Sequence, residues 1–161
     1  MNSTFDMFLE TEVPEDELIV SRTDFTGKIT YVNETFAEIS GYTPEELIGQ
    51  PHNVIRHPDM PRSAFADLWA TVERGDTWEG YVKNLRKDGG YYWVFARVST
   101  VKKNGIAIEY KSVREPVSLE KKIEIQNLYD QLRAKEEGTT RVVLYIKNER
   151  LNEAEKLELK T

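Results

Sequence analysis

The side chains best suited to binding a polar ligand gather in one short run of the chain, QPHNVIRHPDMP, from Gln50 to Pro61. This run holds both histidines of the protein, together with Arg56 and Asp59. A guanidinium can bind a phosphate through two parallel hydrogen bonds, or a carbonyl oxygen through one. Because prolines bracket the run, it is predicted to be a connection between helices that presents these groups to a ligand.

Each of these side chains also has an ordinary structural role. Arg56 could be solvated or pair with Asp59, and Asp59 could instead cap the helix that follows. His57 could serve as a neutral hydrogen-bonding strut, while His52 is better explained by capping or packing after Pro51. The residue types alone leave both interpretations open.

Composition favours a ligand-binding domain over a protein that binds nucleic acid. With 161 residues, 39% of them hydrophobic, the chain can bury one core. The formal net charge is -6, and residues 1–17 contain six acidic and no basic side chains, which accounts for the whole imbalance. An acidic chain without a basic block repels phosphate backbones, so no nucleic-acid partner is expected. The absence of cysteine excludes disulfides and thiolate metal sites.

The sequence carries no membrane signal. Its N-terminus lacks a basic segment followed by an apolar one, and no apolar run approaches the roughly 20 residues that a spanning helix needs. We therefore expect a cytoplasmic protein without direct membrane insertion.

The spacing of apolar residues predicts three short helices between two groups of strands. Asn33 can cap the first helix, and Thr43 with Glu46 forms a capping box at the start of the second. The third has apolar residues at i, i+3, i+4 and i+7, which assigns Trp69 to the core. The predicted helices run from Glu34 to Ser40, from Pro44 to about Gly49 and from Pro61 to Arg74; the predicted strands are Ile19 to Thr23, Lys28 to Val32, Trp78 to Leu85, Tyr91 to Val101 and Ile106 to Arg114.

This order of elements predicts an α+β fold, with a five-stranded antiparallel sheet and short helices that cover one face. Residues 18–116 form the domain, and residues 1–17 form an acidic N-terminal cap or arm. Residues 117–161 form a C-terminal helical interaction segment. Its helix is expected from Ser118 to about Glu137, where Gly138 and two threonines end it.

Several motifs in this arrangement resemble the PAS sensory domain over about residues 18–115. In chain order they are Tyr31-Val32-Asn33, Ser40-Gly41-Tyr42, Glu46 to Pro51 and Arg86 to Trp93. They indicate the fold and not the ligand. More specific are the run PHNVIRHPDMP, the downstream Phe65-Ala66-Asp67-Leu68-Trp69, and Trp78 with Lys83-Asn84. These are similar to the FAD-binding PAS domain of bacterial aerotaxis and energy-taxis receptors.

The resemblance implies a sensor without catalysis. In that family, non-covalently bound FAD reports redox state, which passes to a chemotaxis signalling domain. The resemblance also implies that His57 and Asp59 are needed to retain FAD. No nucleophile paired with a base is visible in the sequence, so an enzyme is not expected.

The resemblance further implies a partner protein. The chain has neither the membrane segment nor the long methyl-accepting coiled coil of an aerotaxis receptor, so it resembles the PAS-only subunit of a split receptor. A membrane-bound methyl-accepting receptor subunit that lacks its own PAS domain would then recruit it to the inner membrane; a homodimer is the alternative. Arg114-Glu115-Pro116 replaces the Asp-x-Thr motif with which many signalling PAS domains end.

A flavin that reports redox state needs an apolar slot with polar groups at its edge. The amide of Asn84 could present its carbonyl to the protonated N5 of a reduced flavin and its NH2 group to the oxidised ring, although an ordinary surface asparagine explains the residue as well. Trp78 could stack on flavin or adenine, or belong to the core. The slot is expected to be lined by Ile39, Ile55, Phe65, Trp78 and Val82.

Two other functions fit the sequence. His52 or His57 could be the axial ligand of haem in a gas sensor, but an arginine and an aspartate beside His57 suit flavin phosphates better than an apolar haem pocket. A PAS domain without a ligand could instead act as a dimerisation module. A light sensor that forms a cysteinyl-flavin adduct is excluded because the chain has no cysteine.

Overall fold

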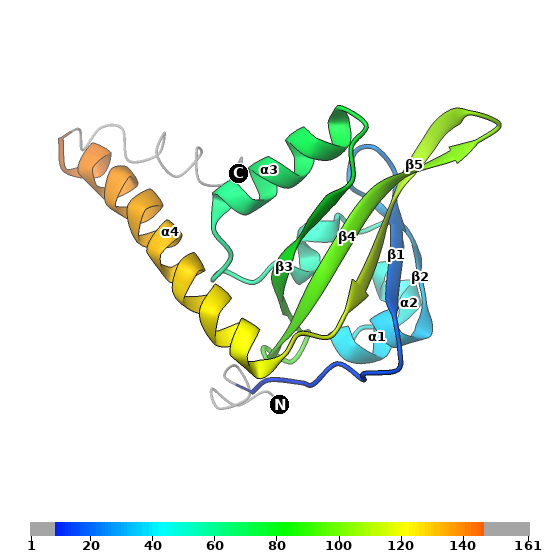
Figure 1. Cartoon of the computed structure of the whole chain (residues 1–161), viewed down its shortest axis with the longest axis horizontal. Helices are drawn as coiled ribbons and strands as arrows, with labels where there is room; N and C mark the ends of the chain where they lie inside the picture. Colours follow the sequence, from blue (N-terminus) through cyan, green and yellow to red (C-terminus); the bar gives the residue numbers. More distant parts are fainter. Residues whose placement is uncertain (1–8, 147–161) are drawn as a thin grey trace.

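One antiparallel sheet forms the centre of the protein, with strand order β2-β1-β5-β4-β3 (Figure 1). The structure is a computed structural model that describes residues 9–146, of which residues 137–146 are described by their backbone alone. The elements are β1 (Ile19–Thr23), β2 (Ile29–Val32), α1 (Glu34–Ser40), α2 (Pro44–Leu47), the 3-10 helix η2 (His52–Ile55), α3 (Arg62–Glu73), β3 (Trp78–Leu85), β4 (Tyr91–Lys103), β5 (Ile106–Glu115) and α4 (Leu119–Ile146). The predicted five-stranded α+β fold is confirmed.

The pairing register decides which side chains meet on each face of the sheet. Asn84 of β3 lies opposite Tyr92 of β4, and Arg114 of β5 lies opposite Ile19 of β1. Directly paired residues point to the same face, and alternate residues along a strand share it. These four side chains therefore lie on the inner face, which α1, η2 and α3 cover.

Asn33 joins the first helix to the centre of the sheet. Its Oδ1 accepts hydrogen bonds from the Phe36 N–H at 3.0 Å and the Val20 N–H at 3.1 Å, and its Nδ2 donates to the Leu18 carbonyl at 2.8 Å. The predicted cap of α1 is thus confirmed, and the same side chain also bonds to the backbone of β1. The predicted capping box of Thr43 and Glu46 at α2 is confirmed as well.

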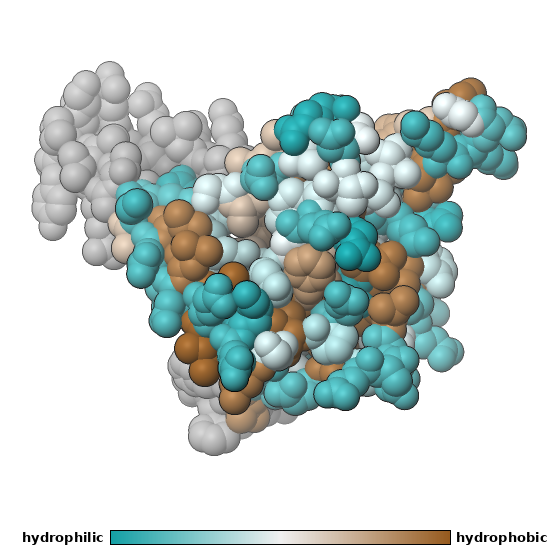
Figure 2. Space-filling model, viewed as in Figure 1, coloured by the Kyte–Doolittle hydropathy of each residue, from teal (hydrophilic) through white to brown (hydrophobic). Residues whose placement is uncertain are grey.

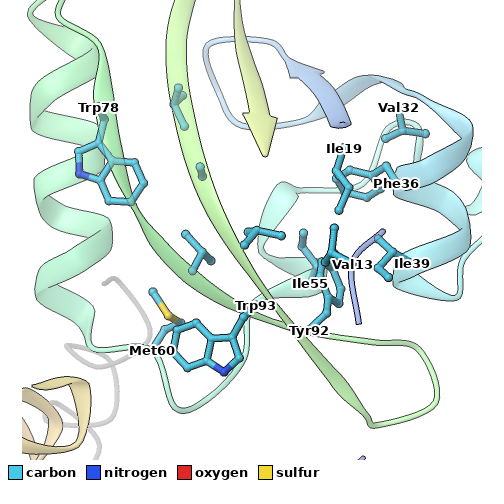
Figure 3. Close-up of a cluster of buried hydrophobic side chains, with 14 of the residues drawn as sticks. Val13, Ile19, Val32, Phe36, Ile39, Ile55, Met60, Trp78, Tyr92 and Trp93 are labelled. Atoms are coloured by element: carbon cyan, nitrogen blue, oxygen red, sulfur yellow. The ribbon is translucent and has the colours of Figure 1, made fainter. Parts of the chain in front are cut away.

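The densest part of the core lies between α1 and the inner face of the sheet. Figure 3 shows Phe36 of α1 close to Ile19, with Ile55 of η2 beside Tyr92. All four side chains have at most 1% of their surface exposed. Trp78, at the other end of β3, lies apart from this cluster (Figure 3). The inner face therefore has a closely packed end and a more open end.

The described part of the N-terminal arm adds to the edge of the fold. The Thr11 N–H donates to the Tyr91 carbonyl at 2.8 Å, and the Tyr91 N–H donates to the Leu9 carbonyl at 3.0 Å. Val13 reaches the core, with 7% of its surface exposed. The acidic Glu10 pairs with Lys122 of α4 at 2.5 Å. Residues 1–8 of the predicted arm lie outside the described residues.

The C-terminal helix differs from its prediction in length and in place. α4 does not end at Gly138 but continues to Ile146. The hydroxyl of Tyr129 donates to the Tyr81 carbonyl at 2.5 Å, and its ring stacks on Trp93 at a centroid distance of 6.2 Å. Tyr81 and Trp93 alternate with inner-face residues, so this helix packs on the outer face of β3 and β4. The short helices cover the inner face, as predicted, and the C-terminal helix lies on the opposite face.

The three hydrogen bonds of Asn33 yield a stability prediction. Asn33→Ala removes the cap of α1 and leaves the Val20 N–H and the Leu18 carbonyl without their partner, which should lower the free energy of unfolding by about 2 kcal/mol. Urea denaturation followed by circular dichroism measures this loss. Asn127→Ala, an exposed position of α4, is the control and should leave stability within about 0.5 kcal/mol. Equal midpoints for the two variants would contradict the assigned role of Asn33.

Candidate functional site

A cavity of about 130 Å³ opens between the inner face of the sheet and the side formed by η2 and α3. A cavity of about 10–15 Å³ is enough to hold one water molecule, so this much larger space suits an organic ring system. Strands β1, β3, β4 and β5 supply its floor. Of the residues singled out in the sequence, those that line it are His52, Ile55, Arg56, Phe65, Trp78, Val82 and Asn84.

Three of the expected site residues lie outside the cavity. Ile39 belongs to the closely packed core below α1. The Nδ1 of His57 accepts the Asp59 N–H at 2.9 Å, and the ring lies edge-on to Tyr91. The carboxylate of Asp59 points to β3, where Lys83 Nζ donates to it at 2.7 Å. His57 and Asp59 therefore fix the shape of the connection instead of facing the cavity.

The expected capping role of Asp59 is wrong. Pro61 is the N-cap of α3, and no side chain at that position bonds to the helix. Asp59 lies two residues before the cap, and its charge is used by Lys83 and by Arg133 of α4, 2.7 and 3.7 Å away. Burial would raise the pKa of Asp59, but these cations lower it overall, so the carboxylate stays ionised.

Asn84 lines the cavity from β3, the edge strand of the sheet. Its backbone forms an isolated antiparallel bridge with Arg56, which ties the connection to β3. Only 3% of Asn84 is exposed, and its Nδ2 has no hydrogen-bond partner among the described residues. The hydroxyl of Tyr92, opposite on β4, also lacks a partner of good geometry, and burial raises its pKa to about 12. The nearest group to the Asn84 amide is thus the Tyr92 hydroxyl, with which it makes no well-aligned bond, so its Nδ2 is available to a ligand.

Arg114 is the residue that the sequence analysis missed. It is 3% exposed, and its Nη2 donates to Ser21 Oγ at 3.0 Å and to His52 Nε2 at 2.8 Å. Its Nη1 has no partner, and no described carboxylate forms an ion pair with it. Burial lowers its pKa to about 10, so it remains charged at neutral pH. Alternation along β5 could have placed Arg114 on the inner face, but not beside His52.

His52 is neutral in this environment. Burial, and then the charge of Arg114, lower its pKa to about 3. Since Arg114 can only donate, the Nε2 atom of His52 must be the acceptor of their bond. The role expected for His52, packing after Pro51, is thus accompanied by a specific hydrogen bond. Because His52 begins η2, this bond also holds η2 against the sheet.

Arg56 brings a second positive charge to the cavity wall. Its guanidinium carbon lies 3.9 Å from the ring centroid of Phe65, which is cation–π contact. Burial lowers the pKa of Arg56 from its usual value. Lys111 is also among the lining residues, but it alternates with Ser112 and Arg114 along β5, so its side chain points to the outer face. Among the described residues, no aspartate or glutamate lines the cavity, although the whole chain is acidic. The site therefore favours an electron-rich or anionic ligand.

Trp78 is held in a fixed orientation at the open end of β3. Its Nε1 donates to Asp67 of α3 at 2.9 Å. The indole passes over Gly80, where an added Cβ would lie only 2.4 Å from ring atoms. Glycine is thus the residue that lets the indole lie flat against the sheet.

The assignment of Trp69 to the core is wrong. It is 36% exposed and lines the cavity from α3. Its ring lies 6.0 Å from that of Tyr110, which in turn lies 5.0 Å from the half-exposed ring of Phe25. We call these three residues the aromatic rim. They extend the apolar surface from the cavity to the solvent.

The described residues contain neither a metal cluster nor a membrane span. No group of three or more histidine, cysteine, aspartate or glutamate side chains within residues 9–136 could hold a metal ion. In the same part of the chain, no helix combines the length and the apolar character that crossing a bilayer requires.

Comparison with known sequences finds relatives among receptors and regulatory proteins. The aerotaxis receptor of Escherichia coli (strain K12) is 44% identical over 124 residues, which is 77% of this chain and 24% of that receptor. A nitrogen fixation regulatory protein of Klebsiella pneumoniae is 30% identical over 91 residues, which is 56% of this chain and 18% of that protein. The chain thus spans a quarter or less of these relatives' length.

Solved structures agree on the architecture. The light state of the blue-light photoreceptor Aureochrome1 LOV domain superimposes with a TM-score of 0.60 at 19% identity, covering 72% of this chain and 91% of that one. A light-oxygen-voltage domain studied with a flavin analogue gives a TM-score of 0.59 at 23% identity, covering 71% and 87%. Residues 29–114, more than half of the chain, match the family described as the PAS fold. The chain therefore belongs to the PAS fold family.

Proposed function

We propose that this protein is a non-catalytic redox sensor, which binds FAD non-covalently in the cavity and relays its redox state to a chemotaxis signalling partner. The observation that carries the proposal is a pair of buried donors on one cavity, Asn84 Nδ2 and Arg114 Nη1, without protein partners. Donors buried in this way cost free energy until an acceptor binds them. The edge of a flavin offers such acceptors in its carbonyl oxygens and ring nitrogens.

The two donors suit the two changes that accompany flavin reduction. When bound, a flavin supplies a ring that gains a proton at N5 and negative charge near N1 and the C2 carbonyl. A guanidinium such as Arg114 favours negative charge beside it. The amide of Asn84 can donate with Nδ2 or accept with Oδ1, so it can follow the gain of a proton by rotating. Neither residue has to transfer a group, which fits a sensor.

The surroundings of the cavity favour FAD over a smaller flavin. Arg56 offers a positive charge at the cavity wall for a pyrophosphate. The aromatic rim offers exposed ring faces on which an adenine can stack. His57 and Asp59 then contribute to FAD retention through position, because they hold the connection that carries Arg56.

The relay needs a partner, and α4 offers a surface for one. Leu119, Ile123 and Leu128 are 70%, 57% and 45% exposed. Figure 2 shows apolar side chains gathered over the first turns of this helix. The similarity to an aerotaxis receptor supports a chemoreceptor as the partner. In this proposal it is a membrane-bound methyl-accepting subunit without its own PAS domain, which recruits the protein to the inner membrane.

The haem alternative has weaker support from the geometry. An axial ligand needs a free nitrogen lone pair that faces the cavity. His57 does not line the cavity, and its Nδ1 accepts the Asp59 N–H. His52 lines it, but its Nε2 accepts from Arg114. A ligand-free dimerisation module would leave Asn84 Nδ2 and Arg114 Nη1 without hydrogen-bond partners.

The cofactor itself is the first test. The protein should purify yellow, with flavin absorption at about 370 and 450 nm that bleaches with dithionite. Heat should release FAD, identified by chromatography against FMN and riboflavin standards. FMN alone would contradict the roles of Arg56 and the aromatic rim. A Soret band would instead support haem, and a colourless protein that fails to take up added FAD would support a ligand-free module.

Asn84 is the second test, because it should connect the flavin to the sheet. Asn84→Ala should retain some flavin but lose the difference in hydrogen exchange between the oxidised and reduced protein in β3, β4 and α4. An amide rotation worth a few kcal/mol suffices to shift a two-state equilibrium of this kind. Asn127→Ala, on the exposed surface of α4, should keep the wild-type difference. If Asn84→Ala keeps it too, the residue is only structural.

The pKa values of the histidines give a third test. The folded pKa of His52 is lowered to about 3 and that of His57 to about 4, both through burial first. The unfolded chain therefore takes up protons first as pH falls below about 6.5, and stability is lost in that direction. Between about pH 6.5 and its folded pKa, each histidine should lower the free energy of unfolding by about 1.4 kcal/mol for every unit that the pH falls. Proton NMR should show no histidine titration between pH 8 and 5; a midpoint near 6.5 would contradict the bond from Arg114 to His52.

A further inference from the structure

The start of α3 is capped by a residue that lies 74 positions further along the chain. Glu136 of α4 accepts the Arg62 N–H with Oε2 and the Ser63 N–H with Oε1, both at 3.0 Å. A helix N-terminus normally takes such bonds from its own N-cap side chain, and here Pro61 offers none. Burial alone would raise the pKa of Glu136, but the two N–H groups and Arg62 lower it, so the cap is a carboxylate.

The neighbouring residues of α4 hold the segment that precedes α3. Arg133 Nη1 donates to the backbone carbonyl of Asp59 at 2.7 Å. Lys83 Nζ bridges the carboxylate of Asp59, at 2.7 Å, and the side chain of Gln126, at 3.1 Å. Residues 56–61 therefore contact α4 through Asp59. At Arg56, the same segment is hydrogen-bonded to Asn84 in the cavity floor.

These bonds connect α4 to the part of the chain that matches the PAS fold, although α4 itself lies outside that match. The match ends at residue 114, before α4 begins. The same helix has its Tyr129 face on the outer side of β3 and exposes Leu119 and Ile123 to solvent. One helix therefore contacts the cavity wall through its polar residues and presents an apolar surface nearby.

We propose that Glu136 and Arg133 are positioning residues of the cavity, so that ligand binding and the seating of α4 are thermodynamically coupled. The inference rests on the proposed binding of FAD. Seated α4 fixes residues 56–61 and holds Arg56 at the cavity wall. By reciprocity, a bound ligand that uses Arg56 stabilises the seated helix, and a partner that draws α4 away weakens ligand binding by the same factor.

The test uses the full chain with Glu136→Gln, which removes the charge and turns one acceptor into a donor facing an N–H. Affinity for FAD, measured by fluorescence titration of the apoprotein, should fall about tenfold, as expected for one lost charged hydrogen bond. Hydrogen exchange at Arg62 and Ser63 should speed up. FAD should also slow exchange in α4 of the wild type, and less so in the variant.

The matched control is Glu124→Gln on the same helix, where the carboxylate is exposed and pairs with Lys121 at 3.0 Å. It should leave FAD affinity and α3 exchange unchanged. If Glu136→Gln does not fold, Arg133→Gln is used, which removes the bond to the Asp59 carbonyl and should weaken FAD by about threefold.

The outcomes separate this inference from the proposed function. Wild-type affinity in Glu136→Gln, or in Arg133→Gln where that variant replaces it, would overturn the coupling while the redox-sensor proposal stands. Equal losses in Glu136→Gln and Glu124→Gln would also overturn it, because the effect would then be general to the helix. A wild-type protein that binds no flavin would overturn the proposed function, and with it the coupling to that ligand.

Discussion

The positive charge of Arg114, enclosed under the sheet without a carboxylate beside it, is the constraint on which the site depends. Burying such a charge is costly unless hydrogen bonds replace its water. Ser21 and His52 accept from one of its amino groups, and this requires His52 to be neutral and η2 to lie close to β1. The other amino group is left at the cavity. The buried charge of Arg114 thus explains three features together: where η2 lies, why His52 is neutral, and why the cavity favours an electron-rich ligand.

Sequence reasoning predicted the elements because their signals are local. Asn33 precedes the helix it caps by one residue, and the strands are marked by runs of β-branched and aromatic residues only a few positions long. The site was harder, since Ser21 and Arg114 meet only through the pairing of β1 with β5, and His52 joins them only through the packing of η2 on that face. The periodicity of α3 placed Trp69 on the apolar stripe correctly, but could not show that this part of the stripe projects beyond the sheet and faces a cavity mouth.

Asp59 shows a second limit of the sequence. Its spacing from α3 fits a helix cap, yet Lys83 and Arg133, 24 and 74 positions away, use its carboxylate and backbone. The N-terminus of α3 is instead capped by Glu136, which no local sequence motif could predict. The same long-range bonds explain why α4, predicted as a separable interaction segment, is part of the wall that supports the connection. Ion pairs between distant segments are decided by the fold, and spacing carries little information about them.

The chain enters and leaves the domain at one corner. Lys122 in the second turn of α4 pairs with Glu10 and Glu12 of the incoming segment, which itself bonds to Tyr91 at the start of β4 (Figure 1). A pull on the incoming segment would load these contacts first, whereas a pull on the far end of α4 would first load those of Glu136, Arg133 and Tyr129. The contacts of Lys122 with Glu10 and Glu12 are ionic and partly exposed, so the resistance of this corner to force should fall as the salt concentration rises. The closely packed end of the core does not depend on these ion pairs.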